Sequence, residues 1–465
     1  LHLIRQRRTF ELATLLLRTS IIWHWVFNMG VIRSQYKKNM LEDVVTAITA
    51  GTADYYFVAS NPSERTGNTP VTTTDDQVSG HELNWNTLFG KKLANNDAIM
   101  MIQNIPWTGN TIYTRYDDTV QMTYESGNSM VIEDFYVVVP PGLQGGYHHV
   151  YKCINNANGS PSTIVPSIQD YSTFTLTDGY TWRYIYSISA TNFNKFGNDN
   201  YVPVTPNAAI VAAAMTYAGI DIVKINNAGS GYSTYHDGTI QSVVSDTSVK
   251  IETTASTFND HYVNSAIYIY NDNDPATSQL RTISAYVSNT TGRWITFTDR
   301  IDTSFVDPLV TRYKISPSVV FDTDGDEEPQ AYTVINTTSN SIGSIVVVEP
   351  GSGISRASAR VVANSAYGSG ASISCIVPPP GGHGSNPVDE LKAQAVGITF
   401  SFIKSEGNTI PISNITYNKV GIIKNPHELT SAGGKASTRF TSNTFDQRSR
   451  FNLSPSLISA MSKDE

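Results

Sequence analysis

The sequence predicts a mostly β, multidomain protein, and three observations carry this prediction. Only 15% of its 465 residues are charged and Tyr (25) outnumbers Phe (17), a composition that suits short strands and turns better than long helices. Aromatic and other residues alternate after a turn signal within residues 176–204, and two later segments share a Gly-Ser-Gly ending. The length allows about two to four domains.

The overall charge argues against one class of function. The formal net charge is -8, so the chain has no general basic field for wrapping nucleic acid through its phosphates. The two cysteines, Cys153 and Cys375, lie far apart and form neither a metal-ligand spacing nor a disulfide framework. We therefore predict two buried free thiols, as in a protein assembled in a reducing cytosol.

Residues 1–28 differ from the rest of the chain. They carry three arginines within residues 5–8, followed by an apolar run that Arg18 and His24 interrupt. No uninterrupted apolar run approaches the roughly 20 residues that a membrane span needs, and no small-residue cleavage site precedes Met29. We interpret Met29 as a natural start and residues 1–28 as a non-native leader, and we expect no membrane association.

The first elements after the leader are a helix and strands. Tyr36, Met40, Val44 and Ile48 recur at helical spacing and predict one amphipathic helix, which Gly51 ends. The segments that follow are a strand over 55–59, a short helix around 83–93 and an apolar segment over 98–105.

The central prediction is a strand that starts at residue 180, after an Asp-Gly turn. Four aromatic residues alternate with other side chains, which is the period of a strand with one aromatic face. Four large rings need an opposing layer to bury them. Strands predicted over 134–139 and 149–154, on either side of the turn PPGLQGG, are expected to join it in an antiparallel sheet. The four rings are Tyr180, Trp182, Tyr184 and Tyr186.

Residues 206–387 are predicted to form an inserted β repeat region. An Ala-rich run at 208–215 marks its start, and a breaker-rich run at 377–387 marks its exit. Residues 221–233 and 344–355 each read as a strand that ends in Gly-Ser-Gly and precedes another strand, which indicates two related β units. Further short strands are predicted over 266–270, 280–287 and 293–298.

After this region, the chain returns to the character of its N-terminal part. We predict one or two helical turns over 388–394, a strand over 396–403, and a strand over 415–426 that Asn425-Pro426 closes. Residues 430–465 are polar with scattered hydrophobic residues and are interpreted as a C-terminal arm.

Three clusters could carry chemistry, and each has a simpler structural interpretation. The acidic cluster 322–328 lacks the late bidentate Glu of a calcium loop, so we favour a solvated turn. His148 and His149 point to opposite faces of a strand and have no partner at zinc spacing, so we favour a polar strand start. His383 lies between glycines and no helix with a basic partner follows, so we favour a tight turn over an anion-binding loop.

No linear motif of an enzyme is found. The sequence contains no G-x-S-x-G elbow, P-loop, dinucleotide fingerprint or H-E-x-x-H motif. Paired carboxylates for glycoside hydrolysis leave no linear signature because their separation is spatial, so a polysaccharide-degrading enzyme stays open as an alternative without positive support. Alternating aromatic residues can also bind sugar rings, but we favour a core role for them. We predict a non-enzymatic protein with no cofactor and no metal site.

A set of short segments carries a more specific signal through its order and spacing, over about residues 29–429. The segments are W-x-G-x-x-x-Y-x-x-Y-D, with Trp107, Gly109, Tyr113, Tyr116 and Asp117; VYKC, with Val150, Tyr151 and Cys153; DGYTWRY, with Asp178, Gly179, Tyr180, Trp182 and Tyr184; YVPV at 201–204; and GIIKNP, with Gly421, Asn425 and Pro426. In these segments the chain resembles the dimer-forming baseplate wedge proteins of T-even-type contractile-tailed bacteriophages, in the longer version found in phages of cyanobacteria.

The resemblance implies an elongated β-sandwich protein in which residues 29–205 and 388–429 form one split domain around the inserted region 206–387, with residues 430–465 as an arm. It also implies a homodimer that contacts other baseplate wedge proteins in the virion, is assembled in the host cytoplasm, and binds neither nucleic acid nor membrane. The implied function is to join neighbouring wedge subunits and repack with them when the tail contracts. The alternative is a receptor- or carbohydrate-binding tail protein, which the Tyr-rich and Gly/Ser-rich β repeats favour.

Overall fold

The computed structural model describes residues 34–60, 87–126, 129–142, 146–272, 274–363, 365–401, 420–429 and 435–446, together with the two-residue strands β1 (Leu16–Leu17) and β29 (Phe451–Asn452). The structure is 46% strand and 10% helix, with several antiparallel sheets, which confirms the predicted fold class. Apart from β1, the leader 1–28 lies outside the described residues.

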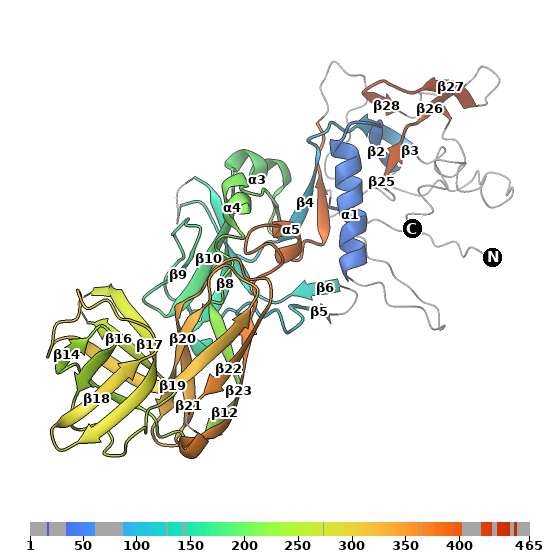
Figure 1. The fold of residues 1–465 in the computed structure, drawn as a ribbon. Coiled ribbons are helices and arrows are strands. Elements are labelled where there is room, and N and C mark those ends of the chain that lie inside the picture. Colours follow the sequence, from blue (N-terminus) through green and yellow to red (C-terminus); the bar gives the residue numbers. More distant parts are fainter. Residues whose placement is uncertain are drawn as a thin grey trace, which may run out of the picture.

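Strands from the two ends of the chain share sheets. In one sheet, β2 (Tyr55–Ser60) lies between β25 (Val420–Lys424) and β3 (Thr87–Lys92), and β28 (Thr444–Asp446) pairs with β3. In another, β4 (Ala98–Gln103) lies between β24 (Ala395–Ile398) and β11 (Tyr201–Pro203), and β1 pairs with β24. The blue and red elements of Figure 1 therefore lie together. We call this part, residues 34–219 and 378–446 as described, the main body.

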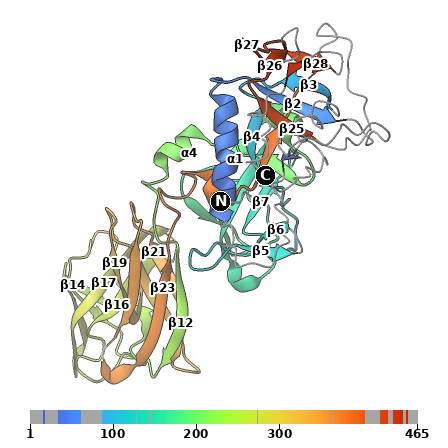
Figure 2. The same ribbon diagram turned by 90° about the vertical axis from the view of Figure 1, so that its right-hand side faces the viewer.

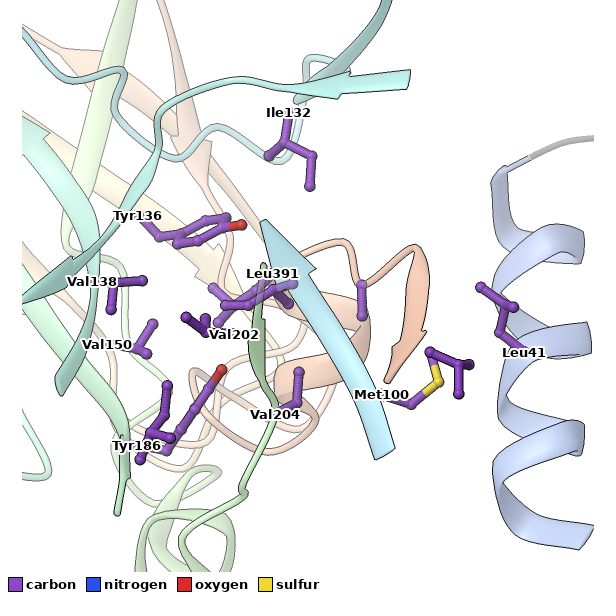
Figure 3. Close-up of a cluster of buried hydrophobic side chains, with 14 of the residues drawn as sticks. Leu41, Met100, Ile132, Tyr136, Val138, Val150, Tyr186, Val202, Val204 and Leu391 are labelled. Carbon is purple, nitrogen blue, oxygen red and sulfur yellow. The ribbon is translucent and has the colours of Figure 1, made fainter. Parts of the chain in front are cut away.

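Helix α1 (Ser34–Thr49) packs against β4 and β24 of the main body. Its buried residues include Leu41 and Ile48, whereas Tyr36 is 57% exposed. Tyr36 is therefore not part of the buried stripe, although the sequence pattern included it. Figure 3 shows Leu41 directed toward Met100 of β4. The helix stops before Gly51, which has a φ of +62° that favours glycine.

A third sheet of the main body has the order β7 (Tyr136–Val139), β8 (His148–Asn156), β10 (Tyr180–Ile188) and β9 (Thr173–Thr175), all antiparallel. This confirms the predicted sheet. The prediction of one aromatic face is wrong for the last of its four rings, Tyr186. A bulge between Tyr184 and Tyr186 shifts the register, so Tyr186 packs in a different core from the other three rings. Figure 3 shows Tyr186 near Val202 and Val204.

Residues 220–377 form two inserted β units, the green-to-orange part of Figure 2. The chain enters on β12 (Ile222–Ser230) and leaves on β23 (Ser369–Ile376), which pair with each other. The long strand β19 (Arg312–Thr323) is shared between the units. Its first half pairs with β13 (His236–Thr239) and β16 (Ser265–Asn271), and its second half with β22 (Ala357–Val362) and β20 (Gln330–Asn336). Each unit has its own hydrophobic core.

The internal repeat has a structural counterpart. The first copy ends β12, and the second follows β21 (Ser341–Glu349), which pairs with β20. Gly229, Gly231, Gly351 and Gly353 have φ values of +63°, +75°, +74° and +68°, so both Gly-Ser-Gly segments bend in the same way. The strands that follow the two copies, β13 and β22, both pair with β19.

Among the other elements predicted from the sequence, one is wrong and several are confirmed. The helix predicted around 83–93 is wrong, because residues 87–92 form β3 between two partner strands and Phe89 is buried there. The predicted inserted strands are confirmed, and the helical turns predicted over 388–394 correspond to α5 (Pro387–Glu390). The remaining elements are β5 (Thr123–Ser126), β6 (Ser129–Ile132), η1 (Ala157–Gly159), α3 (Ala190–Phe196), α4 (Ala208–Ala213), β14 (Ser242–Ser245), β15 (Ser248–Ile251), β17 (Asp274–Asn289), β18 (Gly292–Phe297), η2 (Ser365–Tyr367), α5 (Pro387–Glu390), β26 (His427–Leu429) and β27 (Lys435–Arg439).

Candidate functional site

Most of the sequence-predicted motif residues fall into three places, whereas Tyr116, Val150, Val202 and Val204 belong to the large hydrophobic cluster of the main body. The first is an aromatic core in the main body, where the rings are packed edge to face or stacked. Trp182 lies 5.7 Å from Tyr113 and 5.5 Å from Tyr180, centroid to centroid, and Trp107 packs half-buried against the same cluster. Such packing suits a rigid core rather than an open sugar platform. The buried members of the motif in this core are Tyr113, Tyr151, Cys153, Tyr180, Trp182 and Tyr184.

The Asp-Gly turn holds the aromatic core in place through its hydrogen bonds. The Asp178 carboxylate accepts from the backbone N–H groups of Thr163 at 2.9 Å and Ile164 at 3.0 Å. Gly179 has a φ of +85°, and a Cβ atom there would lie 3.0 Å from Ala157 Cβ. The Tyr180 hydroxyl donates to the Ser160 carbonyl at 2.7 Å, so its polar tip is satisfied although its ring is buried.

The second place is the junction between the main body and the inserted units. The Asp117 carboxylate accepts from Lys224 Nζ on β12 at 2.7 Å, and the adjacent Asp118 carboxylate accepts from the backbone N–H of Val377 at 3.0 Å. Burial raises the pKa of Asp117, but the hydrogen bonds from Lys224 and Thr119 more than reverse this and leave the pKa lowered. The two crossing segments are thus fixed by neighbouring carboxylates.

The third place is β25, which carries the GIIKNP segment and lies in the β2 sheet, apart from the aromatic core. Gly421 and Pro426 are buried. Asn425 has a φ of +50° and closes the strand, because its side-chain oxygen accepts from the backbone N–H of Asp54 at 2.9 Å. The motif as a whole is therefore not one site.

The other sequence-derived candidates are engaged in local structure. Asp324, in the acidic cluster, accepts from the Ser355 hydroxyl at 2.6 Å and from the backbone N–H groups of Ser355 and Arg356, and these hydrogen bonds lower its pKa to about 2. His148 stacks on Phe193 with ring centroids 3.8 Å apart, and His149 Nδ1 lies 2.7 Å from Ser187 Oγ. Among the described residues, no group of three or more His, Cys, Asp or Glu side chains could hold a metal ion. Both cysteines are buried and free, as predicted.

Sequence reasoning missed a buried ion cluster formed by Lys152, His383 and Glu390. Lys152 comes from β8 and is 0% exposed, Glu390 ends α5, and His383 lies in the glycine-rich turn before it. Lys152 Nζ donates to Glu390 Oε1 at 2.8 Å, and the backbone N–H of Gly384 donates to the other carboxylate oxygen at 2.6 Å. The Lys152 ammonium also sits 3.2 Å from the Tyr116 ring centroid.

The imidazole of His383 lies between the two charges. Its Nδ1 atom is 3.0 Å from Lys152 Nζ and 2.9 Å from Glu390 Oε1. Since a neutral ring nitrogen is either a donor or an acceptor, Nδ1 either donates to Glu390 or accepts from Lys152. Burial lowers the pKa of His383 to about 4, and the charge of Lys152 adds to this shift. His383 is therefore neutral at pH 7.

The two charged members stay ionised at pH 7. Burial lowers the pKa of Lys152 to about 8, against the opposing effect of the Glu390 carboxylate. Burial alone would raise the pKa of Glu390, but Lys152 and then His383 bring it to about 2. The cluster thus holds one positive and one negative charge that compensate each other in the interior.

Local sequence explains how α5 reaches this position. Asn386 caps the helix by accepting from the backbone N–H of Asp389 at 3.3 Å. Gly382 has a φ of +88°, and a Cβ atom there would lie 2.1 Å from the Ala214 carbonyl oxygen, so the turn passes too close to α4 for a side chain. Asp389 forms an ion pair with Lys38 of α1, so α5 is joined both to α1 and to β8.

A second missed group lies beside the ion cluster. Arg183 is the cross-strand neighbour of Lys152 and is 1% exposed. The signal for both was a lone basic residue inside an otherwise apolar and aromatic strand, in HHVYKCINN and in YTWRYIYSI. A buried base of this kind requires a partner that only the tertiary structure reveals.

Three further findings concern membrane-spanning helices and similarity to known proteins. No described helix is long and apolar enough to cross a membrane. No protein-family model matches the chain, and no curated protein is significantly similar to it.

Proposed function

We propose that the protein is a structural, non-enzymatic subunit of a contractile phage tail baseplate wedge, which joins neighbouring wedge subunits and repacks with them on contraction. The resemblance of its short segments to that family motivates the proposal. The junction of the two bodies is the single observation that supports it most, because Asp117, the last residue of one such segment, joins the two bodies there.

At the junction, Asp117 and Asp118 hold both the entering and the leaving segment of the inserted units. Two crossing segments with separate anchors restrict the motion between the bodies more than one linker would. The β units are thus carried at a defined position on a split main body. A subunit that has to transmit force between neighbours needs such a connection.

The buried ion cluster also supports a structural role. Its three members are at most 3% exposed, and their hydrogen-bonding atoms face one another. A catalytic acid or base must reach the proton that it transfers. These groups instead connect β8 with α5 and with the glycine-rich turn before α5, which favours a structural role over a catalytic one.

The mechanism would be a change of interfaces. Packed interfaces tend to have discrete alternative arrangements, so a rearrangement at one subunit is passed on as a rigid-body shift. In this scheme the aromatic core and the ion cluster keep each body rigid, and the contacts between subunits change. Homodimerisation would place two copies of the same surface across a symmetry axis.

A receptor- or carbohydrate-binding tail protein is the second candidate, and one observation favours it. On the inserted units, Tyr268 stacks between Tyr270, at 5.1 Å, and Tyr332, at 4.9 Å between ring centroids. Tyr268 and Tyr270 are partly exposed. Aromatic rings on a β face can bind sugars, although here each ring covers the face of the next.

The two candidates are separated by solution mass. The chain would be purified alone and co-expressed with the other tail subunits of the same genome, and each sample measured by light scattering after size exclusion. A stable dimer that enters a larger heteromeric complex is expected. A trimer that joins no other tail subunit and binds glycans on an array would refute the wedge proposal and favour the second candidate.

A further inference from the structure

The two inserted units touch each other around one histidine as well as sharing β19. We call the unit of β13–β18 the first and the unit of β12 and β20–β23 the second. The loop between β15 and β16 carries His261, whose ring centroid lies 4.2 Å from that of Tyr367 on η2 of the second unit. His261 Nε2 lies 3.3 Å from the carbonyl oxygen of Ser233, in the segment 231–235 that connects β12 with β13. His261 thus joins both units and their connection.

The surroundings of His261 fit a neutral ring. A carbonyl oxygen only accepts, so Nε2 carries the hydrogen and donates to Ser233. Nδ1 is buried and has no hydrogen-bond partner in the described part of the chain. A proton added to Nδ1 would therefore create a charge that no acceptor receives. Burial accordingly lowers the pKa of His261, and the hydrogen bond to Ser233 opposes this shift only in part.

Among the described residues, the elements that pack against His261 offer a protonated ring no counter-charge. Segment 231–235 reads Gly-Tyr-Ser-Thr-Tyr and η2 reads Ser-Ala-Tyr, so their only titratable groups are tyrosines, which stay neutral between pH 5 and pH 7.5. On its own loop, Asp260 and Tyr262 flank His261, and neither is a cause of the shift in its pKa. Glu252, at the start of that loop, accepts from the backbone N–H and the hydroxyl of Thr239 instead.

Strand β19 changes its partners at Pro317. Residues 312–315 pair with β13 and 312–317 with β16, whereas residues 318–323 pair with β22 and residue 318 with β20. Pro317 has no N–H group to donate to a ladder. Ser316 Oγ, and Oγ of Ser265 opposite Pro317, are buried without a hydrogen-bond partner in the part of the chain that the structure describes. The strand is thus held least firmly where one unit passes into the other, so residues 316–318 are the natural axis for a swing.

We propose that the contact around His261 is an acid-sensitive lock between the two inserted units. When the ring takes up a proton from the solvent, it leaves Tyr367 and Ser233 for water, and the first unit becomes free to swing about residues 316–318. The inference goes beyond the proposed function. It holds whether or not the chain belongs to a wedge, because both units are parts of the same chain.

A second aromatic contact keeps the units together while the lock opens. Tyr268 of the first unit stacks on Tyr332 of the second with ring centroids 4.9 Å apart. Burial raises the pKa of Tyr332 to about 12, so acid does not change its charge. The continuous backbone of β19 also remains. Acid should therefore loosen the arrangement of the two units without separating them fully.

The lock has a defined pH dependence. A released imidazole has the ordinary pKa of 6.5, whereas the locked ring has a lower one, so between these values the open state binds one proton more. The ratio of open to locked chains should rise about tenfold for each unit by which the pH falls below 6.5, until the pKa of the locked ring is reached. Above pH 7.5 the ratio should stay constant.

Distance measurements between the two units test the proposal. Spin labels would be attached to Val244→Cys on β14 of the first unit and to Thr338→Cys between β20 and β21 of the second, both at exposed positions. The native thiols, Cys153 and Cys375, are buried and burial raises the pKa of both, so the labels react with the introduced ones. One distance is expected at pH 7.5, and a second, broader population should grow toward pH 5.

Three variants identify the titrating group. His261→Gln keeps a neutral donor for the Ser233 carbonyl and takes up no proton, so the units should stay locked at pH 5. His261→Lys carries a charge throughout and should be open at pH 7.5. His236→Gln is the matched control in the same unit, because burial also lowers the pKa of His236 but its Nδ1 lies 2.8 Å from the Tyr313 hydroxyl within that unit. It should respond to acid as the wild type does.

Several results would overturn the lock. A distance that stays constant down to pH 5, or an equal acid response in the wild type and His261→Gln, contradicts it. If His261→Gln does not fold, an NMR titration of the wild-type ring decides, and a pKa of His261 at or above 6.5 refutes the proposal. Loss of hydrogen-exchange protection at β18 along with the distance change would mean that the first unit unfolds instead of swinging. None of these results bears on the wedge proposal, which light scattering tests.

Discussion

Mild acid should weaken the main body through His383. Its pKa is about 4 in the folded chain against an ordinary 6.5, so between these values the unfolded chain binds a proton that the folded chain does not. Stability is therefore lost as the pH falls below about 6.5. The difference of about 2.5 in pKa corresponds to about 3 kcal/mol in full, of which about 2 kcal/mol is lost by pH 5.

The choice of pH isolates this group from its neighbour. The pKa of Glu390 is about 2 against an ordinary 4.5, so its contribution is also lost on acidification, but mainly below pH 4.5. Comparing pH 7 with pH 5 thus tests His383 nearly alone within the ion cluster. Replacing it in His383→Gln should remove most of the extra loss between the two pH values.

The assay has to resolve the two bodies, because a chain of several cores need not unfold in one step. Urea unfolding followed by amide hydrogen exchange reports β8 and β10 of the main body separately from β16 and β18 of the inserted units. His261→Gln is the matched control, since burial also lowers the pKa of His261 and this residue contacts the Ser233 carbonyl between the inserted strands. It should alter the pH dependence of the inserted units and leave β8 unchanged.

The reasoning is refuted if the wild type and His383→Gln lose equal stability at β8 between pH 7 and pH 5. That result would mean that His383 is protonated in the folded chain or reaches water at low cost.

Three further predictions concern the core, the ion cluster and the junction. Trp182→Ala, at a side chain that is 0% exposed, should lower the free energy of unfolding by about 3–5 kcal/mol in urea titrations, and an unchanged value would contradict its core role. Glu390→Gln should lower the free energy of unfolding by about 3–5 kcal/mol because it leaves the Lys152 charge buried without a counter-charge. Glu390→Leu combined with Lys152→Met should lower it far less, and equal losses would refute the pairing. A double-mutant cycle of Asp117→Asn and Lys224→Met should give a coupling of about 0.5–1 kcal/mol, and a coupling near zero would mean that the junction ion pair contributes nothing.

The fold class could be predicted from the sequence because composition and strand period are local properties. The β7, β8 and β10 strands follow from alternating or continuous apolar runs between turn residues, and the pairing of β7 with β8 follows from the short connection between them. Such local properties could not have prevented the wrong prediction of a helix around 83–93. Its residues 87–92 become β3 because β2 and β28 flank them, and β28 lies more than 350 residues later in the chain.

The candidate site was largely hidden for the same reason. Lys152 and Glu390 are separated by 238 residues, so nothing near either one predicts the pair. The face of Tyr186 depends on a bulge that one extra residue creates, and no turn residue marks it. By contrast, the Asp-Gly turn was predictable, because Gly179 and the capping carboxylate of Asp178 act within the segment itself.

The pairing of β2 with β25 also sets the order in which the chain can complete its fold during translation. About 360 residues separate the end of β2 from the start of β25, a synthesis time on the order of 20–70 s at roughly 5–20 residues per second. The strands nested between them can close first, β13 with β19 and then β12 with β23. The edge of β2 stays open for that whole period, and an open strand edge is a template for pairing with another chain. Nascent chains on one polysome would therefore compete with the late arrival of β25 for the same row of backbone hydrogen bonds.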